Sequence, residues 1–537
     1  GYPRLFANFS DEIMPTLGTY GGGGGTGGLY VEDPRWPEPL NRSLFTGDWG
    51  RSAVFHHPLQ SRAATFEISQ ESFVGIPRAT GMDLDALGNL YIASWWSGEA
   101  SVYVGPHVGF VARVSPVPQS APSPNDSSDG EATLRRFAQV RDLAVAELIA
   151  MLREPQSVIR FHAQGELLRR GPSPESAQAL HAVVADPNFP MAGRVAALFA
   201  FKQLEGERSH PELIRLLEDD SIREFAIRAL ADRRSQMGGV TAELLLPYLR
   251  DPNPRVVAQT VIALGRIGDP VAADWLLPLA ELGTTERPDA AAPNPPSVIP
   301  HLAVQAIVRL QATDACLAGL DRDCWRAALR ALRQMHNSTA VNGLISRLEE
   351  ERDVERQTAI LTTLIRLYQH ETPYDGSWWG IRPDTTGPYY DPMTWSESDR
   401  IKTVVRAAID FAAPPMRATL IAELQRHQLQ WDGLAVETEL GEVEVADPIV
   451  IQPVDPNDPE QIGNLGYAES VRRALELTGD VTRGQELFRA RSCVSCHTAT
   501  AGQRPVGPHL ADIGKRYKPE ELLESMLKPS EKIAQGY

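Results

Sequence analysis

The sequence is poor in cysteine, in long apolar runs and in positive charge. Its longest wholly apolar run, residues 195–201, has 7 residues, far short of the roughly 20 that a membrane-spanning helix needs. Its 52 Lys and Arg against 69 Asp and Glu give a net charge of −17, whereas a nucleic-acid surface needs clustered cations. These shortages exclude a transmembrane segment and a nucleic-acid partner. What is left is ordinary globular composition in a chain of 537 residues, enough for about three or four domains.

Two of the 4 cysteines stand in the one stretch whose spacing specifies a chemistry, Cys493-Val494-Ser495-Cys496-His497. Two thiols three positions apart reach the two vinyl groups of one haem, and the imidazole after the second thiol is placed to ligate the iron. Chance yields this pattern in roughly one sequence in a thousand of this composition. The motif predicts haem c bound covalently by Cys493 and Cys496, with His497 as axial ligand.

The rival readings of the motif are a redox C-x-x-C and half of a zinc site. A zinc site needs a second Cys or His pair nearby, and the other two cysteines, Cys316 and Cys324, lie far upstream. A thioredoxin-like site needs a surrounding βαβ pattern, which is missing here. Both readings are therefore weaker than the haem.

The flanks of the motif fit the same interpretation. Residues 479–488 predict a capped helix that carries Leu487 and Phe488 toward the thiols. Residues 506–510 resemble the G-P-x-L segment of class I cytochromes c, in which the proline carbonyl accepts the second N–H of the proximal histidine. Such a bond fixes the tautomer and raises the basicity of the ligand. The resemblance implies that Pro508 orients His497.

A sixth iron ligand is harder to assign. Met526 is the sole methionine after the motif, but it falls inside a predicted helix over 519–528, where it is also suited to face the core. His509 is tied to the Pro508 loop and is a poor distal ligand. We therefore expect the true sixth ligand and a closing helix to lie beyond Tyr537, with Met526 kept as the distal candidate of this chain.

Residues 1–116 predict strands. Short alternating runs at 65–68, 81–95 and 108–114 are split by turn signals, as in a sandwich or in propeller blades. The glycine run 21–28 formally contains G-x-G-x-x-G, but no amphipathic helix follows it, so we expect a flexible turn. Asp83 and Asp85 are a weak calcium pair, because aspartates in a hairpin more often bond turn amides.

Residues 133–372 predict a helical solenoid. Apolar residues recur at helical spacing, and helix breaks at Glu154, Asp186, Asp219 and Asp251 are 32, 33 and 32 residues apart. A helix pair cannot bury its apolar stripe alone, so such a period implies stacked pairs, and the pattern resembles HEAT repeats. Within this region Cys316 and Cys324 are compatible with a disulfide or with two buried free thiols.

The remaining segments connect these parts. Composition indicates a linker over 117–132, an aromatic-rich loop plus helices over 373–436, and an acidic linker over 437–466. The sequence thus predicts a multidomain protein with a β-propeller remnant at 1–116, an α-helical HEAT-like solenoid at 133–372 and an α-helical class I cytochrome c-like domain at 467–537, which we expect to be truncated.

Residues 44–55, 103–109 and 374–390, with the haem module, resemble the haem-binding C-x-x-C-H proteins of planctomycetes and verrucomicrobia. That family has a propeller similar to those of quinoprotein sugar dehydrogenases. The resemblance implies that residues 1–116 are its closing blades, and that a quinone such as PQQ would belong to earlier blades absent from this sequence. No catalytic residue can be carried over. Asp48, Arg51, His57 and Arg78 are polar candidates, although such residues more often pack a blade or face solvent.

Two functions follow as expectations. One is an oxidoreductase that oxidises a sugar or polyol and passes single electrons through the haem to a redox partner protein or a membrane acceptor. The other is a non-catalytic propeller and HEAT scaffold whose haem is a relay or a sensor. Haem attachment of this kind takes place outside the cytoplasm, so we expect a periplasmic or otherwise extracytoplasmic protein. Because the chain begins at Gly1 without Met or a signal peptide, we expect a mature piece or a fragment.

Overall fold

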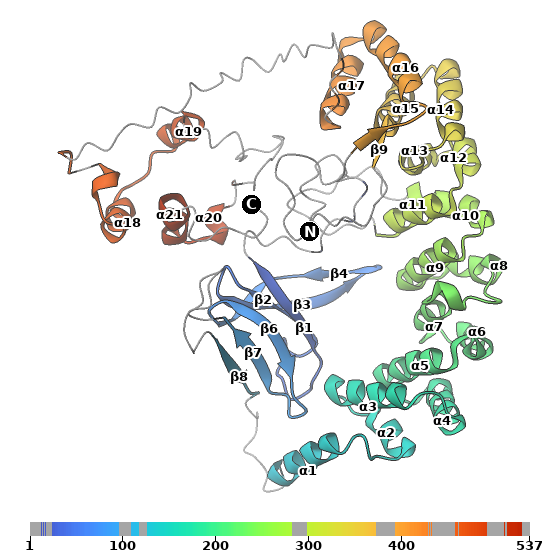
Figure 1. Cartoon of the computed structure of the whole chain (residues 1–537), viewed down its shortest axis with the longest axis vertical. Coiled ribbons are helices and arrows are strands. Elements are labelled where there is room, and N and C mark those ends of the chain that lie inside the picture. The colour runs from blue at the N-terminus through green and yellow to red at the C-terminus, as the bar shows by residue number, and fades with distance from the viewer. Residues whose placement is uncertain are drawn as a thin grey trace.

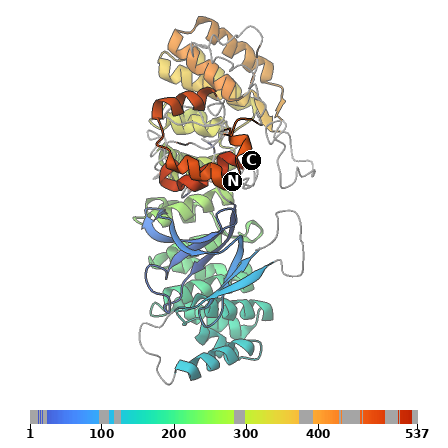
Figure 2. The ribbon, with the colours of Figure 1, turned by 90° about the vertical axis from the view of Figure 1, so that its left-hand side faces the viewer.

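The structure, a computed structural model, describes residues 12, 14, 17, 24–95, 109–116, 126–281, 298–371, 392–427, 429, 431, 457–459, 461–490, 510 and 513–528. These residues form two N-terminal antiparallel sheets, a long curved column of helix pairs with a small two-stranded sheet near its end, and a small group of C-terminal helices (Figure 1). Viewed from the side, the sheets lie in front of the lower half of the column and the C-terminal helices in front of its middle (Figure 2). In the described part of the chain, every helix is too short or too polar to cross a membrane.

Eight strands make the two N-terminal sheets. The first sheet has the order β1-β2-β3-β4, with β5 also paired to β3, and the second has the order β6-β7-β8; all these pairs are antiparallel. The strand bounds are β1 Gly25–Val31, β2 Ser43–Asp48, β3 Ala53–Arg62, β4 Thr65–Ile68, β5 Glu71–Gly75, β6 Ala79–Leu84, β7 Leu90–Ser94 and β8 Phe110–Val114. The predicted strands at 65–68, 81–95 and 108–114 are confirmed.

A compact aromatic cluster holds the sheets together. Alternate residues of β2 point inward, as a half-buried strand requires, and Phe45 meets Phe73 edge to face at 5.0 Å between ring centroids. Trp36 packs beside both rings and donates its indole N–H to the Gly88 carbonyl at 2.9 Å. The described strands form two separate sheets and close no ring of blades, so the structure supports antiparallel β-structure here and leaves the propeller as a hypothesis.

The expectation of a flexible turn in the glycine run is wrong from residue 25 onward, because Gly25–Gly28 belong to β1. Gly27 sits at an irregularity in the β1–β2 register with a φ of +58°, a conformation that glycine adopts without strain. A Cβ atom there would also lie 3.2 Å from the Gly81 Cα of β6. The glycine run therefore lets β1 pass close to the second sheet.

The hairpin between β6 and β7 explains Asp85. Its carboxylate accepts the amide N–H groups of Leu87 and Asn89 at 2.8 and 2.9 Å, and the Asn89 side chain at 2.8 Å. An aspartate whose carboxylate accepts the amide N–H groups of the turn that follows it is common in tight hairpins. The turn interpretation is confirmed for Asp85.

The predicted solenoid is present. Helices α3, α5, α7, α9, α11, α13 and α15 pack in succession along the inner side of the column, toward the sheets, and α4, α6, α8, α10, α12 and α14 lie along the outer side (Figure 1). The helix bounds are α1 Asp126–Ala138, α2 Val145–Met151, α3 Ser157–Arg170, α4 Pro174–Ala185, α5 Met191–Glu205, α6 His210–Arg215, α7 Arg223–Leu230, α8 Ala242–Leu245, α9 Pro254–Ile267, α10 Ala273–Glu281, α11 Val298–Leu310, α12 Thr313–Gly319, α13 Trp325–Leu332, α14 Ser338–Glu350 and α15 Val354–Leu367. Short 3₁₀ helices also lie between α5 and α10. They are η3 Gly206–Ser209, η4 Leu216–Glu218, η5 Arg234–Gln236, η6 Leu246–Arg250 and η7 Pro270–Ala272.

Arginines of the inner helices link successive repeats. Arg194 of α5 donates to the Val184 carbonyl of its own repeat and to the Asp219 carboxylate of the next, at 2.9 and 2.8 Å. Arg223 of α7 likewise pairs with Asp251 at 2.7 Å. Asp219 and Asp251 are two of the helix breaks that define the repeat period of the sequence. The carboxylates that bond one repeat to the next therefore stand at the positions that show the period.

Beyond α15 the described part of the chain continues with a strand pair and two further helices. Strand β9 Gln369–Glu371 pairs with β10 Pro392–Thr394, and α16 Ser398–Phe411 and α17 Pro414–Arg426 pack on α15. The aromatic-rich stretch 374–390 and most of the acidic linker lie outside the described residues. At the other end, α1 begins at Asp126, inside the stretch 117–132 whose composition indicates a linker.

Cys316 and Cys324 are both buried free thiols. Burial, with the nearby Cys324 thiol adding to it, raises the pKa of Cys316 to about 12, and burial also raises the pKa of Cys324. Of the two possibilities left open by the sequence, the structure shows the free thiols.

Candidate functional site

The helix that leads into the C-x-x-C-H motif begins as the sequence predicts. Helix α19 spans Val481–Ala490, and the Asp480 carboxylate before it accepts the amide N–H of Arg483 at 2.7 Å. An aspartate at this place satisfies one of the amides that a helix start leaves without a partner. The start of α19 is therefore fixed by a side-chain cap.

The described helices on either side of the motif pack against each other. Helix α18, Tyr467–Glu476, precedes the motif and contacts α21, Pro519–Leu527, which follows it. The Lys528 ammonium group lies 4.4 Å from the centroid of the Tyr467 ring. The remaining elements are η8 Ile462–Asn464 and α20 Ile513–Arg516. Because α18 precedes the motif and α21 follows it, their contact joins the two flanks of the motif into one module, which we call the C-terminal module.

This module carries apolar side chains that its own helices do not cover. Val481 and Leu487 of α19 are 78% and 46% exposed, and Leu477 just after α18 is 75% exposed. A haem brings two broad apolar faces that need apolar side chains against them. With the thiol, thiol and imidazole donors of the motif, the residues present fit haem c.

Met526 lies in the last turn of α21 and is 68% exposed. The alternative that this side chain fills the core of the module is therefore wrong. Its side chain is accessible, which a ligand to an iron requires.

Cys493, Cys496, His497, His509 and Pro508 lie outside the described residues. Their roles as thioether anchors, axial ligand, poor distal ligand and carbonyl acceptor stay predictions. Among the residues that the structure does describe, no three His, Cys, Asp or Glu side chains are grouped so as to hold a metal ion. Asp83 and Asp85 accordingly belong to no such group.

The polar candidates in the sheets are tied to the local fold. His57 is buried; its imidazole contacts the Thr46 hydroxyl at 2.8 Å and the Ser69 carbonyl at 3.1 Å, and burial lowers its pKa. Asp48 accepts the amides of Gly24 and Arg51 at 3.1 and 2.9 Å. The Arg78 guanidinium stacks on Trp49, 5.0 Å from the ring centroid. His57, Asp48 and Arg78 therefore stabilise the local fold, which is the role that the sequence favours for them.

Arg51 does more than the sequence indicates. Its guanidinium lies 4.7 Å from the centroid of the Phe55 ring in β3 and 5.8 Å from that of Tyr517, directly after α20. Tyr517 belongs to the C-terminal module, so this cation–π contact joins that module to the first sheet. No local pattern in the sequence points to a pair 466 residues apart.

Comparison with known families matches two segments of the chain. Residues 210–292 match the model for HEAT repeats, and residues 481–536 match the model for cytochrome c. The chain therefore contains a HEAT-repeat region and a cytochrome c domain, which implies haem c and a role in electron transfer. The second match contains the whole of Cys493 to His497 and begins at the first residue of α19.

Comparison with whole proteins adds little. Among solved structures, one of human deoxyhypusine hydroxylase in complex with glycerol is 16% identical over 55% of this chain and 99% of its own, with a TM-score of 0.21. A TM-score this low carries no argument about fold or function. No curated protein matches the chain.

Proposed function

We propose that this chain is part of an extracytoplasmic c-type haem protein that carries single electrons between a donor and a redox partner. The observation that carries the proposal is the C-x-x-C-H motif at 493–497, inside the segment that matches cytochrome c. Covalent attachment of haem c occurs outside the cytoplasm, which is the reason for the location. The acceptor is a soluble partner protein or a membrane-bound carrier.

The chain's own residues divide the work at this site. The Cys493 and Cys496 thiols would anchor the group covalently, and the His497 imidazole would ligate the iron. The Pro508 carbonyl accepts the other imidazole N–H and so holds the ring in one tautomer. Val481 and Leu487 would cover part of the apolar faces of the group. Haem c supplies reversible one-electron chemistry at the iron, and Met526 is the distal candidate.

For the electron donor we propose a dehydrogenase site in a propeller to which the N-terminal sheets belong, with a sugar or polyol as substrate and a quinone such as PQQ as its cofactor. The resemblance of residues 44–55 to that class supports this. So does the contact of Tyr517 with Arg51, because it places the C-terminal module against the sheet that would carry the donor. No residue of this chain is assigned a catalytic role.

The second candidate is a non-catalytic scaffold whose haem is a relay or a sensor. The described sheets favour it in one respect: His57, Asp48 and Arg78 are engaged in turns and packing. The two candidates predict different behaviour toward small substrates.

The first experiment tests the haem. The protein is expressed with a c-haem maturation system and extracted with acidified acetone; the haem should stay with the protein, and the pyridine haemochrome spectrum should be that of two thioether bonds. Cys496→Ala should shift that spectrum to one thioether bond, and His497→Ala should change the Soret absorption of the native protein by removing its axial imidazole. Cys316→Ala is the matched control and should change neither. Haem that extracts completely from the unmodified protein would refute the assignment.

The second experiment separates the two functions. The longest natural form of the protein, loaded with a quinone, is mixed with a panel of sugars and polyols, and reduction of the haem is followed by its absorbance. Reduction by one chemical class supports the dehydrogenase. Failure across the panel, with a haem that dithionite still reduces, supports the scaffold.

A further inference from the structure

The N-terminal part of the chain touches the solenoid at a carboxylate, Glu32, directly after β1. The Glu32 carboxylate pairs with the Arg160 guanidinium of α3, which is 9% exposed. The Glu32 carbonyl accepts the amide N–H of Ser157, the first residue of α3, at 3.0 Å. Gln156 before α3 makes no side-chain cap, so the amide that a helix start leaves unpaired is satisfied by Glu32.

At Arg160 this contact replaces a bond between repeats. Arg194 and Arg223 take their carboxylates from Asp219 and Asp251, 25 and 28 residues further along the chain. Asp186 stands at the corresponding place after Arg160, but it lies 3.7 Å from Arg153 instead. Arg160 still donates to the Glu154 and Pro155 carbonyls of its own repeat, both at 2.8 Å. Glu32 of the N-terminal part thus occupies the carboxylate position of the arginine series.

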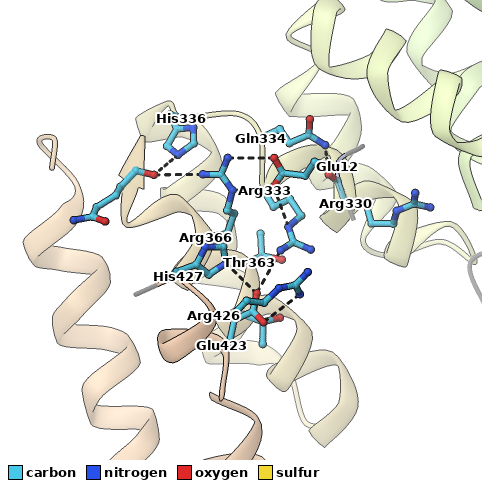
Figure 3. Close-up of polar contacts among 12 residues, drawn as sticks. Glu12, Arg330, Arg333, Gln334, His336, Thr363, Arg366, Glu423, Arg426 and His427 are labelled. Atoms are coloured by element: carbon cyan, nitrogen blue, oxygen red, sulfur yellow. Dashed lines mark hydrogen bonds and ion pairs between the residues drawn. The ribbon is translucent and has the colours of Figure 1, made fainter. Parts of the chain in front are cut away.

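A second carboxylate, Glu12, reaches the other end of the solenoid. The Arg366 guanidinium of α15, only 5% exposed, donates to both Glu12 carboxylate oxygens, at 2.8 and 3.2 Å (Figure 3). Arg333 lies 3.7 Å from the same carboxylate, and the Gln305 amide contacts the Glu12 carbonyl at 3.5 Å. A two-point fork on a buried arginine is the strongest geometry for holding a carboxylate.

Between these ends the sheet meets the middle of the column. Phe66 of β4 lies against Arg255 of α9, with 5.5 Å from its ring centroid to the guanidinium carbon, and Val158 of α3 packs on the core of the sheets. Figure 1 shows β4 extending toward α9 on the inner side of the column. The contacts with α3, α9 and α15 therefore follow the inner face from its first repeats to its last.

We propose that the inner face of the solenoid is a docking surface for the N-terminal part of this same chain, anchored at its two ends by Glu32 on Arg160 and Glu12 on Arg366. In a solenoid each repeat contacts only its neighbours, so the column by itself bends along its length. A segment bonded to both α3 and α15 ties distant repeats together. The docked sheet then keeps Arg51, and with it the C-terminal module, at a fixed place relative to the column.

The test uses the full haem-loaded chain and three variants, Glu32→Gln, Glu12→Gln and the double substitution. Glutamine keeps the size of each side chain and removes the charge that the buried arginine holds. Glu67→Gln is the matched control, because Glu67 pairs with Arg62 inside the sheet and both side chains are about half exposed. Circular dichroism checks that each variant stays folded.

Hydrogen exchange of a short peptide that contains Ser157 is the first readout. Because that amide bonds only to the docked segment, exchange there should rise by about tenfold or more in Glu32→Gln, with little change in Glu67→Gln. The second readout is the radius of gyration from X-ray scattering, which should increase in the double variant as the N-terminal part leaves the column.

Equal exchange and equal size in all variants would overturn the proposal. Loss of helical content in Glu32→Gln alone would also count against it, since it would mean that Glu32 serves the fold of α3 and not docking. The charge exchange Glu12→Arg with Arg366→Glu supplies an independent arm. Either single change should enlarge the particle, and the pair together should restore its size.

Discussion

Replacing Arg194 by methionine should loosen two neighbouring repeats of the solenoid and leave the rest of the chain intact. The side chain is 1% exposed and makes four polar contacts: two to the Val184 carbonyl, at 3.1 and 2.9 Å, one to the Ser221 hydroxyl at 3.1 Å and one to Asp219 at 2.8 Å. Methionine fills most of the space and makes none of these bonds.

The magnitude follows from what is left behind. The Val184 carbonyl loses both of its bonds to Arg194, at a cost of about 1–3 kcal/mol for a buried acceptor without a partner. Asp219 keeps the Ser221 amide at 3.0 Å and remains partly exposed, so its loss is smaller than for a fully buried charge. The sum is about 3 kcal/mol, within the range for breaking a buried pair.

Native-state hydrogen exchange measures this change locally, which matters because a solenoid does not unfold as a single unit. Amides of α4, α5 and α7 should exchange about a hundredfold faster, since 1.4 kcal/mol corresponds to tenfold. Arg208→Met is the matched control: Arg208 is 74% exposed, pairs with Glu205 at 3.0 Å, and should cost less than about 1 kcal/mol. If Arg194→Met protects these helices as well as Arg208→Met does, the argument that the arginine series holds the repeats together fails.

Three further predictions concern titration, ligation and thiol reactivity. Burial, with the positive charge of Arg330, lowers the pKa of His301 to about 4. Below about pH 6.5 the unfolded chain binds a proton at His301 and the folded chain does not, so the free energy of unfolding should fall by up to about 3 kcal/mol as the pH drops from 6.5 toward 4. In urea titrations, His301→Gln should remove that part of the pH dependence. Carbon monoxide should bind the reduced protein rapidly both with and without Met526→Ala; a low-spin spectrum that resists carbon monoxide and is lost in the variant would instead establish Met526 as the ligand. Cys316 and Cys324 should react with a thiol reagent only on unfolding, because both are buried and their pKa values are raised; stoichiometric labelling of the native protein at pH 8 would contradict this.

Local signals in the sequence were sufficient for the helix pairs, the strands and the haem motif. The breaks at Glu154, Asp186, Asp219 and Asp251 predict the solenoid because a helix with one apolar face must stack. Two of these residues, Asp219 and Asp251, receive the arginine bonds between repeats. Cys493 to His497 indicate a haem because the reach of two thiols and an imidazole is set by a few bonds. Asp480 marked the start of α19 for a similar reason, since a cap acts over three residues.

Contacts between distant segments were decided by the tertiary structure alone. Glu12 and Arg366 are 354 residues apart, and Glu32 and Arg160 are 128 apart. No motif or periodicity in the sequence around Glu12 or Glu32 indicates its arginine partner. The strand at Gly25–Gly28 depends on a distant contact in the same way, since Gly27 is needed where β1 passes the Gly81 backbone of the second sheet. Local sequence specifies which residues become helix, strand or ligand, because those choices depend on near neighbours. Which arginine receives which carboxylate depends on how completed elements pack, and only the folded chain brings those groups within bonding distance.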